Sequence, residues 1–266
     1  MNERHRPRPP RSIAVVLPLM LIALYLPLAV MLISSFTDIQ DGGSYFTLRW
    51  YHEVFADPAL WEALSRSFLV ASGAAAMSTL LGLLGALAID KWSFRARVVL
   101  RTLSWLSLML PELVLALALL SWFALFGLTL SLWTVIAAHI TLTLPFVILI
   151  IGARLKGLDP AYDDAARDLG AREWQVLTRV TLPLLAPSIV TGFLLAFLIS
   201  FDDFLVTFYT NGVGSDTLPV RLYSMMKQGM SPKIQALSSI MLIVSVVLIA
   251  LLARLRGLKS LADAES

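Results

Sequence analysis

The sequence predicts an all-α integral membrane protein with six membrane-spanning helices and both termini in the cytoplasm. Hydrophobic residues make up 58% of the 266 residues, and the mean hydropathy is +0.79. A water-soluble domain does not carry so large an apolar fraction. The apolar runs have the length of membrane helices, and the short alternating segments of an outer-membrane barrel are absent from the sequence.

The expected membrane spans are apolar runs of about 20 residues, which match a hydrocarbon core of ~30 Å. The first run is too long for the hydrophobic region of a signal peptide and lacks a convincing cleavage site, so we expect it to remain in the protein. The spans are expected at about 13–33, 67–89, 102–126, 132–151, 184–208 and 234–253, in one transmembrane domain over 13–253.

The second expected span carries a stripe of small residues at every fourth position, and such a stripe lets another helix approach closely. The stripe consists of Ala74, Ser78, Gly82 and Ala86.

The positions of the basic residues predict which side of the membrane each loop faces. Sixteen of the 21 Lys and Arg lie in the basic tail 1–12, the loop after the second span, the segment 154–181 and the tail 254–266. Loops rich in Lys and Arg stay on the cytoplasmic side. The count therefore predicts an even number of spans and places the polar segment 159–183 in the cytoplasm.

The segment 159–183 carries the punctuation of a short helix. Asp159 can cap the first backbone donors, Pro160 fits the first helical position, and Gly170 fits a left-handed residue after the helix end. A second short helix is expected over 172–180. Periodicity alone leaves two interpretations open, a connector lying on the membrane surface and a surface for a partner protein. One face of the first helix is apolar and comprises Tyr162, Ala165, Ala166 and Leu169.

No motif in the sequence indicates catalysis or cofactor binding. There is no cysteine, no phosphate-binding loop and no H-E-x-x-H metal pair, and no Ser/His/Asp set has a catalytic spacing. We therefore expect a non-catalytic chain without a metal or cofactor of its own. If its work is driven by ATP, then ATP and Mg²⁺ bind to another subunit.

Three carboxylates are expected at membrane depth, at Glu112, Asp202 and Asp203. A carboxylate there costs about 2.5–3.5 kcal/mol on insertion scales and must be compensated. Because these spans hold no Lys or Arg, a cationic solute is the sharper hypothesis. The alternatives are protonation, a hydrogen bond to helix backbone, or water at the outer end of the fifth span. Adjacent helical residues point about 100° apart, so we expect only one of the two aspartates to face a pathway.

A count of residues along the spans places Glu112 and Asp202 at depths that differ by ~10 Å, at ~1.5 Å per residue. Trp122, Phe201 and Tyr209 are candidates for stacking on amines, although aromatic packing is the commoner role. For His139, a hydrogen bond between helices is favoured over a place in the pathway.

The polar segment also resembles a family motif. It reads Asp164-Ala165-Ala166, three residues, Gly170, nine residues, then Val180-x-Leu182-Pro183. This resembles the EAA loop of ABC-importer permeases, E-A-A-x3-G-x9-I-x-L-P, with Asp164 for Glu and Val180 for Ile. The resemblance implies a type I ABC importer permease fold with cytoplasmic coupling helices. It implies that an ATPase contacts Tyr162, Asp164, Ala165, Ala166, Leu169, Gly170, Leu182 and Pro183.

Further segments resemble the second permease subunit of spermidine/putrescine importers. They are Arg49-Trp50-Tyr51, Ser200-Phe201-Asp202-Asp203-Phe204, Leu218-Pro219 and Ser231-Pro232-Lys233-Ile234-Gln235-Ala236.

This second resemblance implies transport of a polyamine across the bacterial inner membrane. It also implies an ATPase dimer, a second, different permease subunit and a periplasmic binding protein as partners, with no nucleic acid. The substrate-pathway candidates are then Glu112, Asp202, Asp203, Tyr209 and Trp122.

Several other functions remain as alternatives. A permease for another small solute, such as an amino-acid derivative or an iron complex, would share the same loop. An ion-coupled secondary transporter would show inverted repeats, which we do not find in the sequence. A membrane scaffold would have no reason to hold three intramembrane carboxylates.

Overall fold

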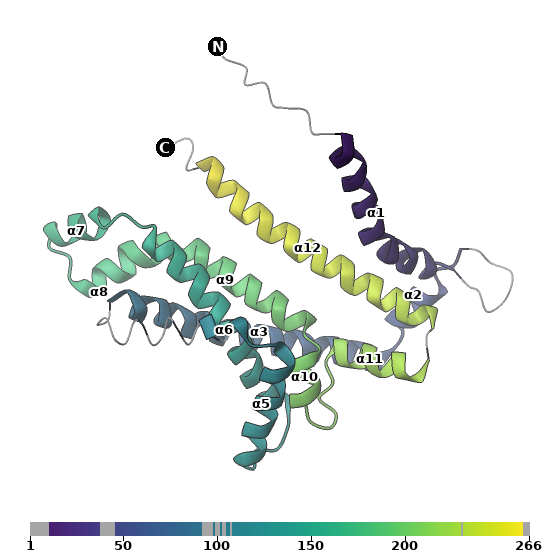
Figure 1. Ribbon diagram of the computed structural model, residues 1–266. Coiled ribbons are helices and arrows are strands. Elements are labelled where there is room, and N and C mark those ends of the chain that lie inside the picture. Colours follow the sequence, from purple (N-terminus) through teal and green to yellow (C-terminus); the bar gives the residue numbers. More distant parts are fainter. Residues whose placement is uncertain are drawn as a thin grey trace. The chain divides into compact units, whose positions relative to one another are not determined.

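The computed structural model describes residues 11–37, 46–91, 98, 102, 105–106, 108–229 and 231–262, and all regular structure in them is helical (Figure 1). The predicted basic tail 1–12 and the cytoplasmic loop near 92–101 lie almost wholly outside these residues. The elements are α1 (Arg11–Ser34), α2 (Arg49–Phe55), α3 (Pro58–Lys91), α5 (Glu112–Leu125), α6 (Leu132–Lys156), α7 (Ala161–Asp168), α8 (Glu173–Val176), the π-helix η1 (Leu177–Thr181), α9 (Leu182–Asp202), α10 (Leu205–Thr210), α11 (Leu218–Gln228) and α12 (Pro232–Ala262).

Five helical stretches among the described residues are long and apolar enough to cross a membrane. A sixth apolar helix, α5, is shorter, with 14 residues. The all-helical membrane class is thus confirmed, while the count of six spans and the side of each terminus stay predictions. The five stretches are Val16–Ser34, Pro58–Asp90, Leu132–Lys156, Glu173–Asp202 and Pro232–Ala250.

The chain divides into two compact units. The smaller unit contains residues 1–57 and 225–242, and polar bonds between its segments hold it together. The Trp50 indole N–H donates to the Thr37 carbonyl at 3.2 Å, and the hydroxyls of Ser35 and Tyr51 lie 2.7 Å apart. Lys233, at the start of α12, pairs with Asp57 at 2.8 Å.

The larger unit contains residues 58–224 and 243–266, and its core lies where α3, α6 and α9 pack together. The small-residue stripe of α3 lies at this junction, as predicted. Ala74 and Ser78 are fully buried, and a Cβ atom built on Gly82 would lie 2.6 Å from a methyl group of Val147 in α6. Glycine at this position is therefore what permits α3 and α6 to approach so closely.

Two predicted spans are interrupted: the third at Pro111, as expected from that proline, and the fifth at Asp203, where no break was expected. Within the expected 184–208, α9 ends at Asp202 and α10 begins at Leu205, because Asp203 has extended backbone with ψ 131°. Within the expected 102–126, Pro111 is likewise extended, with ψ 132°, and α5 begins at Glu112. Proline has no N–H to continue a preceding helix. Both breaks fall next to the carboxylates that the sequence singles out.

Candidate functional site

One cavity of about 660 Å³ brings together all three predicted carboxylates. Glu112 reaches it from the first turn of α5, and Asp202 and Asp203 reach it from the end of α9. The remaining lining is mainly apolar, with Leu115 and Phe146 among its residues. A hydrophilic solute therefore meets an acidic edge in an otherwise apolar cavity.

The carboxyl groups of Glu112 and Asp203 lie within hydrogen-bonding reach of each other. The break at Pro111 sets the start of α5 and so the position of Glu112. The expected difference of ~10 Å in depth between Glu112 and Asp202 stays a prediction. Two carboxylates in contact repel, so this pair holds either a shared proton or a cation between its oxygens.

Both aspartates line the cavity, contrary to the expectation that only one of them would face it, because Asp203 leaves the helix with extended backbone. Their surroundings nevertheless differ. Asp202 is exposed, and both of its carboxylate oxygens accept from the Ser245 hydroxyl of α12, at 3.1 and 2.8 Å. Asp203 is buried, with 7% of its surface exposed. Of the two aspartates, Asp202 is thus the one that solvent reaches.

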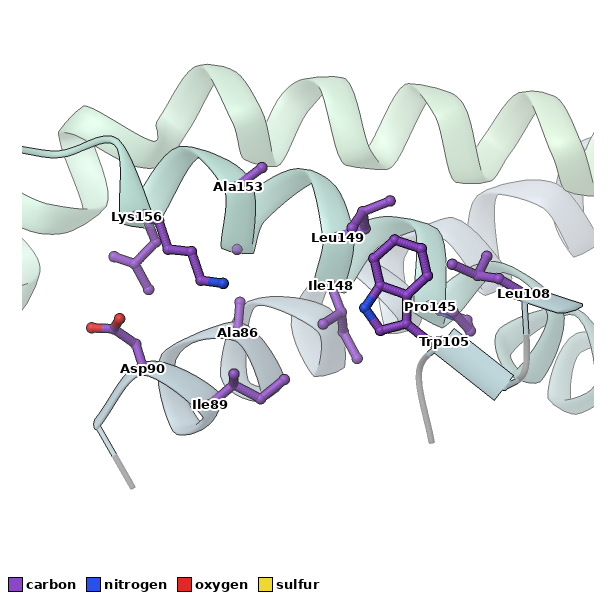
Figure 2. Close-up of a pocket in the computed structure, with 12 residues that line it drawn as sticks. Ala86, Ile89, Asp90, Trp105, Leu108, Pro145, Ile148, Leu149, Ala153 and Lys156 are labelled. Atoms are coloured by element: carbon purple, nitrogen blue, oxygen red, sulfur yellow. The ribbon is translucent and has the colours of Figure 1, made fainter. Parts of the chain in front are cut away.

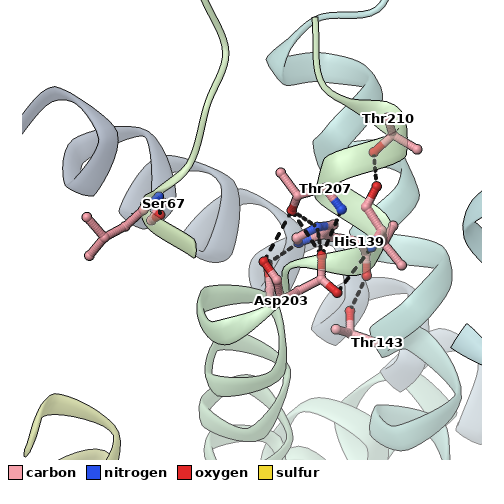
Figure 3. Close-up of polar contacts among 9 residues, drawn as sticks. Ser67, His139, Thr143, Asp203, Thr207 and Thr210 are labelled. Atoms are coloured by element: carbon pink, nitrogen blue, oxygen red, sulfur yellow. Dashed lines mark hydrogen bonds and ion pairs between the residues drawn. The ribbon is translucent and has the colours of Figure 1, made fainter. Parts of the chain in front are cut away.

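Asp203 is surrounded by donors from its own chain (Figure 3). Oδ2 accepts from the Thr207 backbone N–H at 2.8 Å and from the Thr207 hydroxyl at 2.9 Å, and Oδ1 accepts from the Val206 N–H at 3.4 Å. These donors belong to the first turn of α10, whose amides have no partner within the helix. Asp203 thus caps α10, and the capping explains why the span breaks where it does.

His139 of α6 completes this arrangement. Its Nε2 lies 3.1 Å from Asp203 Oδ2 and 2.9 Å from Thr207 Oγ1, and its Nδ1 lies 2.6 Å from Ser200 Oγ. An ionised carboxylate can only accept, so Nε2 carries an N–H toward Asp203. The predicted hydrogen bond between helices at His139 is confirmed.

The contacts continue from His139 to α3. The Thr143 hydroxyl donates to the His139 carbonyl at 2.7 Å and lies 2.7 Å from the Ser78 hydroxyl. We call Ser78, Thr143, His139, Ser200, Asp203 and Thr207 the buried polar network. It links α3, α6, α9 and α10 through groups that are each satisfied within the chain, which avoids a cost of about 1–3 kcal/mol for each unsatisfied group.

For Asp203 the expected hydrogen bond to helix backbone is present, and His139 is a further partner. Asp203 also lines the cavity beside Glu112, so the cationic-solute hypothesis stays a prediction for this residue. In the sequence, only Lys and Arg were considered as side-chain partners for the three carboxylates. A usable signal was present in Asp203 and Thr207 themselves, since an Asp shortly before a polar β-branched residue is typical of a helix start.

The two aromatic pathway candidates do not line the cavity in the described residues. Trp122 lies further along α5 and packs on Phe126, with ring centroids 4.7 Å apart. Tyr209 packs in α10 against the apolar cluster of Phe123 and Val206. Both side chains thus have the packing role that the sequence left open for them.

The segment 159–183 forms the predicted first helix, α7 (Figure 1). The Asp159 side chain accepts from the Ala161 N–H at 2.9 Å, and Gly170 has a left-handed φ of +85°, both as predicted. The apolar side chains of this segment are exposed, Tyr162 at 57% and Leu169 at 90%. A helix whose apolar face is exposed in the isolated chain fits a surface that a partner covers.

An exposed ion-pair cluster joins α7 to α8. Arg167 donates to Glu173 at 2.8 Å and to Asp164 at 3.1 Å. The hydrogen bond that Arg167 donates to Glu173 raises the pKa of the guanidinium above its ordinary value, so this side chain stays charged. The cluster fixes the turn between the two helices at the residues that resemble the coupling motif.

The expected second helix over 172–180 is not a separate element. After α8 the chain passes through the π-helix η1 directly into α9, so Glu173–Asp202 is one apolar stretch. Leu182 and Pro183 then lie in the first turn of α9 rather than after a break. A π turn leaves room for a proline that cannot donate to the preceding turn.

A second cavity, of about 210 Å³, lies between the ends of α3 and α6 (Figure 2). Its wall is apolar and includes Trp105 and Ile148. Asp90 and Lys156 stand together at one end of it (Figure 2). This lining suits a hydrophobic group better than a hydrophilic solute.

Apolar membrane helices, a cavity with an acidic edge and an exposed helix on a polar segment together define a membrane component of a transport system. Residues 78–258 match the family model described as the binding-protein-dependent transport system inner membrane component, and the chain belongs to this family. Membership excludes the ion-coupled secondary transporter and the scaffold. It accords with the expected non-catalytic role.

The relatives make the comparison more specific. The chain is 36% identical to the spermidine/putrescine transport system permease protein PotC of Haemophilus influenzae, over 86% of this chain and 90% of that protein. It is 31% identical to the putrescine transport system permease protein PotI of Escherichia coli, over 86% of this chain and 84% of that protein.

A solved structure shows the same fold. A chain of a bacterial ABC transporter involved in the import of the polysaccharide alginate matches with a TM-score of 0.71 at 16% identity, over 93% of this chain and 99% of that one. The fold is thus that of an ABC importer permease.

Proposed function

We propose that this chain is the permease subunit of an importer that passes a polyamine, of the spermidine or putrescine type, across the bacterial inner membrane. The observation that carries the proposal is the cavity in which Glu112 and Asp202 stand at an apolar wall. The names of the polyamine permeases at 36% and 31% identity support the same solute class.

A cationic group fits this cavity for an electrostatic reason. Glu112 and Asp203 need a proton or a cation between them, and Asp202 adds a third carboxylate at the same cavity. An ammonium group supplies both the charge and several N–H donors. The methylene segments of a polyamine then lie along the apolar lining.

Glu112 and Asp203 lie next to each other at the cavity, and Asp202 adjoins Asp203 in the chain. This chain therefore holds one ammonium group, and the remaining amines of the solute contact the second permease subunit. The affinity of the site for the ammonium group is low, because Asp203 already accepts hydrogen bonds from its own chain. A low affinity also lets the solute leave again.

The energy for transport comes from outside this chain. An ATPase dimer that binds ATP and Mg²⁺ docks on the exposed apolar side chains of α7, of which Leu169 is the most exposed. Closure of the dimer moves α7, and the continuous helix from Glu173 to Asp202 carries this movement to the acidic cavity. The cavity then opens to the periplasmic binding protein, because the ATP-bound state favours the outward-facing form.

An uptake assay in cells that express the complete transporter tests this proposal. Labelled spermidine is offered with excess putrescine or with unrelated amino acids as competitors. We expect competition by putrescine alone and, for Glu112→Gln and Asp202→Asn, a loss of uptake on the order of tenfold, since each removes one charge-assisted contact.

The control is Glu53→Gln, whose carboxylate pairs with Arg49 and is not among the residues that line the cavity. Its loss is expected to leave uptake unchanged. If the wild-type transporter takes up no polyamine, the solute class is wrong and another small solute takes its place. If both cavity variants transport normally, the acidic cavity is not the solute site.

A further inference from the structure

His139 occupies a position that neither the family match nor the relatives assign to a function. Its ring is fully buried, and its two nitrogens contact different elements on the two sides of a helix break. Nδ1 contacts Ser200 in α9, and Nε2 contacts Asp203 and Thr207 at the start of α10. One side chain of α6 therefore bridges the break between α9 and α10.

We propose that His139 is a positioning residue for transport: it holds the Asp203 carboxylate, and with it the break between α9 and α10, in the place that shapes the acidic cavity. This role deepens the proposed function and rests on it. His139 itself does not line the cavity in the described residues, so it acts on the solute only through Asp203.

The geometry explains why a histidine serves here. Asp203 already receives two backbone N–H groups and one hydroxyl, all from α10. Those bonds fix the carboxylate relative to α10 alone. The bond from His139 Nε2 fixes it relative to α6, whose Leu142 and Phe146 also line the cavity. That bond ties the Asp203 carboxylate itself to the helix that supplies part of the apolar wall.

Substitution of His139 by glutamine or by asparagine distinguishes a positioning role from a packing role. Glutamine can place its amide nitrogen near the position of the histidine Nε2 and so donate to Asp203. Asparagine is shorter, and its amide reaches only the position of Nδ1, next to Ser200. The variants His139→Gln and His139→Asn thus each keep one of the two bonds of the ring.

The experiment measures, in proteoliposomes with the complete transporter, the number of spermidine molecules taken up per ATP hydrolysed. This ratio does not depend on how much transporter assembles. We expect His139→Gln to keep at least half of the wild-type ratio and His139→Asn to lose on the order of tenfold, because a hydrogen bond to a charged group is broken.

A second pair of variants tests the same carboxylate from α10. Thr207→Val removes the hydroxyl donor to Asp203 and keeps the side-chain volume. Thr210→Val, one turn later, removes a hydroxyl that donates only to the Val206 carbonyl. Both threonines are fully buried. We expect the ratio to fall severalfold for Thr207→Val and to stay at the wild-type value for Thr210→Val.

Equal ratios for His139→Gln and His139→Asn, whether both normal or both low, overturn the positioning role. Equal ratios for the two threonine variants overturn it as well, and they decide the matter if the histidine variants fail to assemble. Failure of the wild-type transporter to take up spermidine is a different result. It rejects the proposed solute, and the same ratio is then measured with the solute that the transporter does carry.

Discussion

The buried polar network and the α7 helix differ in which side chains they bury and which they expose. In the network, His139 and Thr207 are fully buried, and each contacts a polar partner from another helix. On α7 and the turn after it, Tyr162 and Leu169 are apolar and exposed, and Arg167 pairs with Asp164 and Glu173 at the surface. The polar groups of the network find their partners within the chain, whereas the apolar side chains of the α7 segment are exposed.

This difference indicates where the chain needs partners. Buried polar groups that satisfy one another fix the relative positions of helices, because a lost partner leaves an orphaned group in a medium without water. Exposed apolar side chains on a short helix contribute little to the stability of the chain itself. They are placed to contribute to binding instead.

The largest effect is expected where the α7 surface meets its proposed partner. Leu169→Asp puts a charge at the most exposed apolar side chain of this segment, directly after α7, and we expect copurification of the ATPase to fall on the order of a hundredfold, since loss of a main contact residue costs about 2 kcal/mol or more. Membrane levels of the chain stay unchanged, because Leu169 is 90% exposed in the chain alone.

The matched control is Leu169→Met, which keeps an apolar side chain of similar size and retains the ATPase. Undiminished copurification with Leu169→Asp would show that α7 is a surface connector and not the docking helix.

A smaller effect is expected for a substitution in the core between α3 and α6. This substitution should affect the stability of the chain itself rather than the binding of the ATPase. A Cβ atom at Gly82 of α3 would lie 2.6 Å from the stiff side chain of Val147, so Gly82→Ala forces the two helices apart. Overpacking of this kind costs about 1–3 kcal/mol. We expect a lower melting temperature of the purified chain and a lower membrane level.

Gly152→Ala provides the comparison, because a Cβ atom there meets nothing within 4 Å. Alanine is the better helix former, so this variant is expected to match or exceed the wild-type melting temperature. Equal melting temperatures for Gly82→Ala and Gly152→Ala would contradict the close approach of α3 and α6.

The α7 segment could be predicted from the sequence because its signals are local. Asp159 and Gly170 act on the chain within a few residues, as a cap and a left-handed residue. The small-residue stripe of α3 also has a local period, although its partner α6 does not follow from that period. Where the structure depends on neighbours in the chain, the sequence predicts it well.

The buried polar network could not be predicted in the same way. His139 and Asp203 lie 64 positions apart in the sequence, and their contact depends on how α6 packs against α9. Helix propensity alone would continue α9 through Asp203. The hydrogen bonds that Asp203 accepts from the first turn of α10 end α9 there instead. The same applies to Glu112, whose contact with Asp203 depends on the break at Pro111.

Hydrogen–deuterium exchange of the full-length chain in lipid nanodiscs, with and without its ATPase, tests the contrast between the two regions most directly. The account predicts that amides in 161–176 exchange at least tenfold more slowly once the ATPase binds. It predicts that amides of α10, held by Asp203, exchange slowly in both samples. Unchanged exchange in 161–176 while the ATPase remains bound would contradict the account.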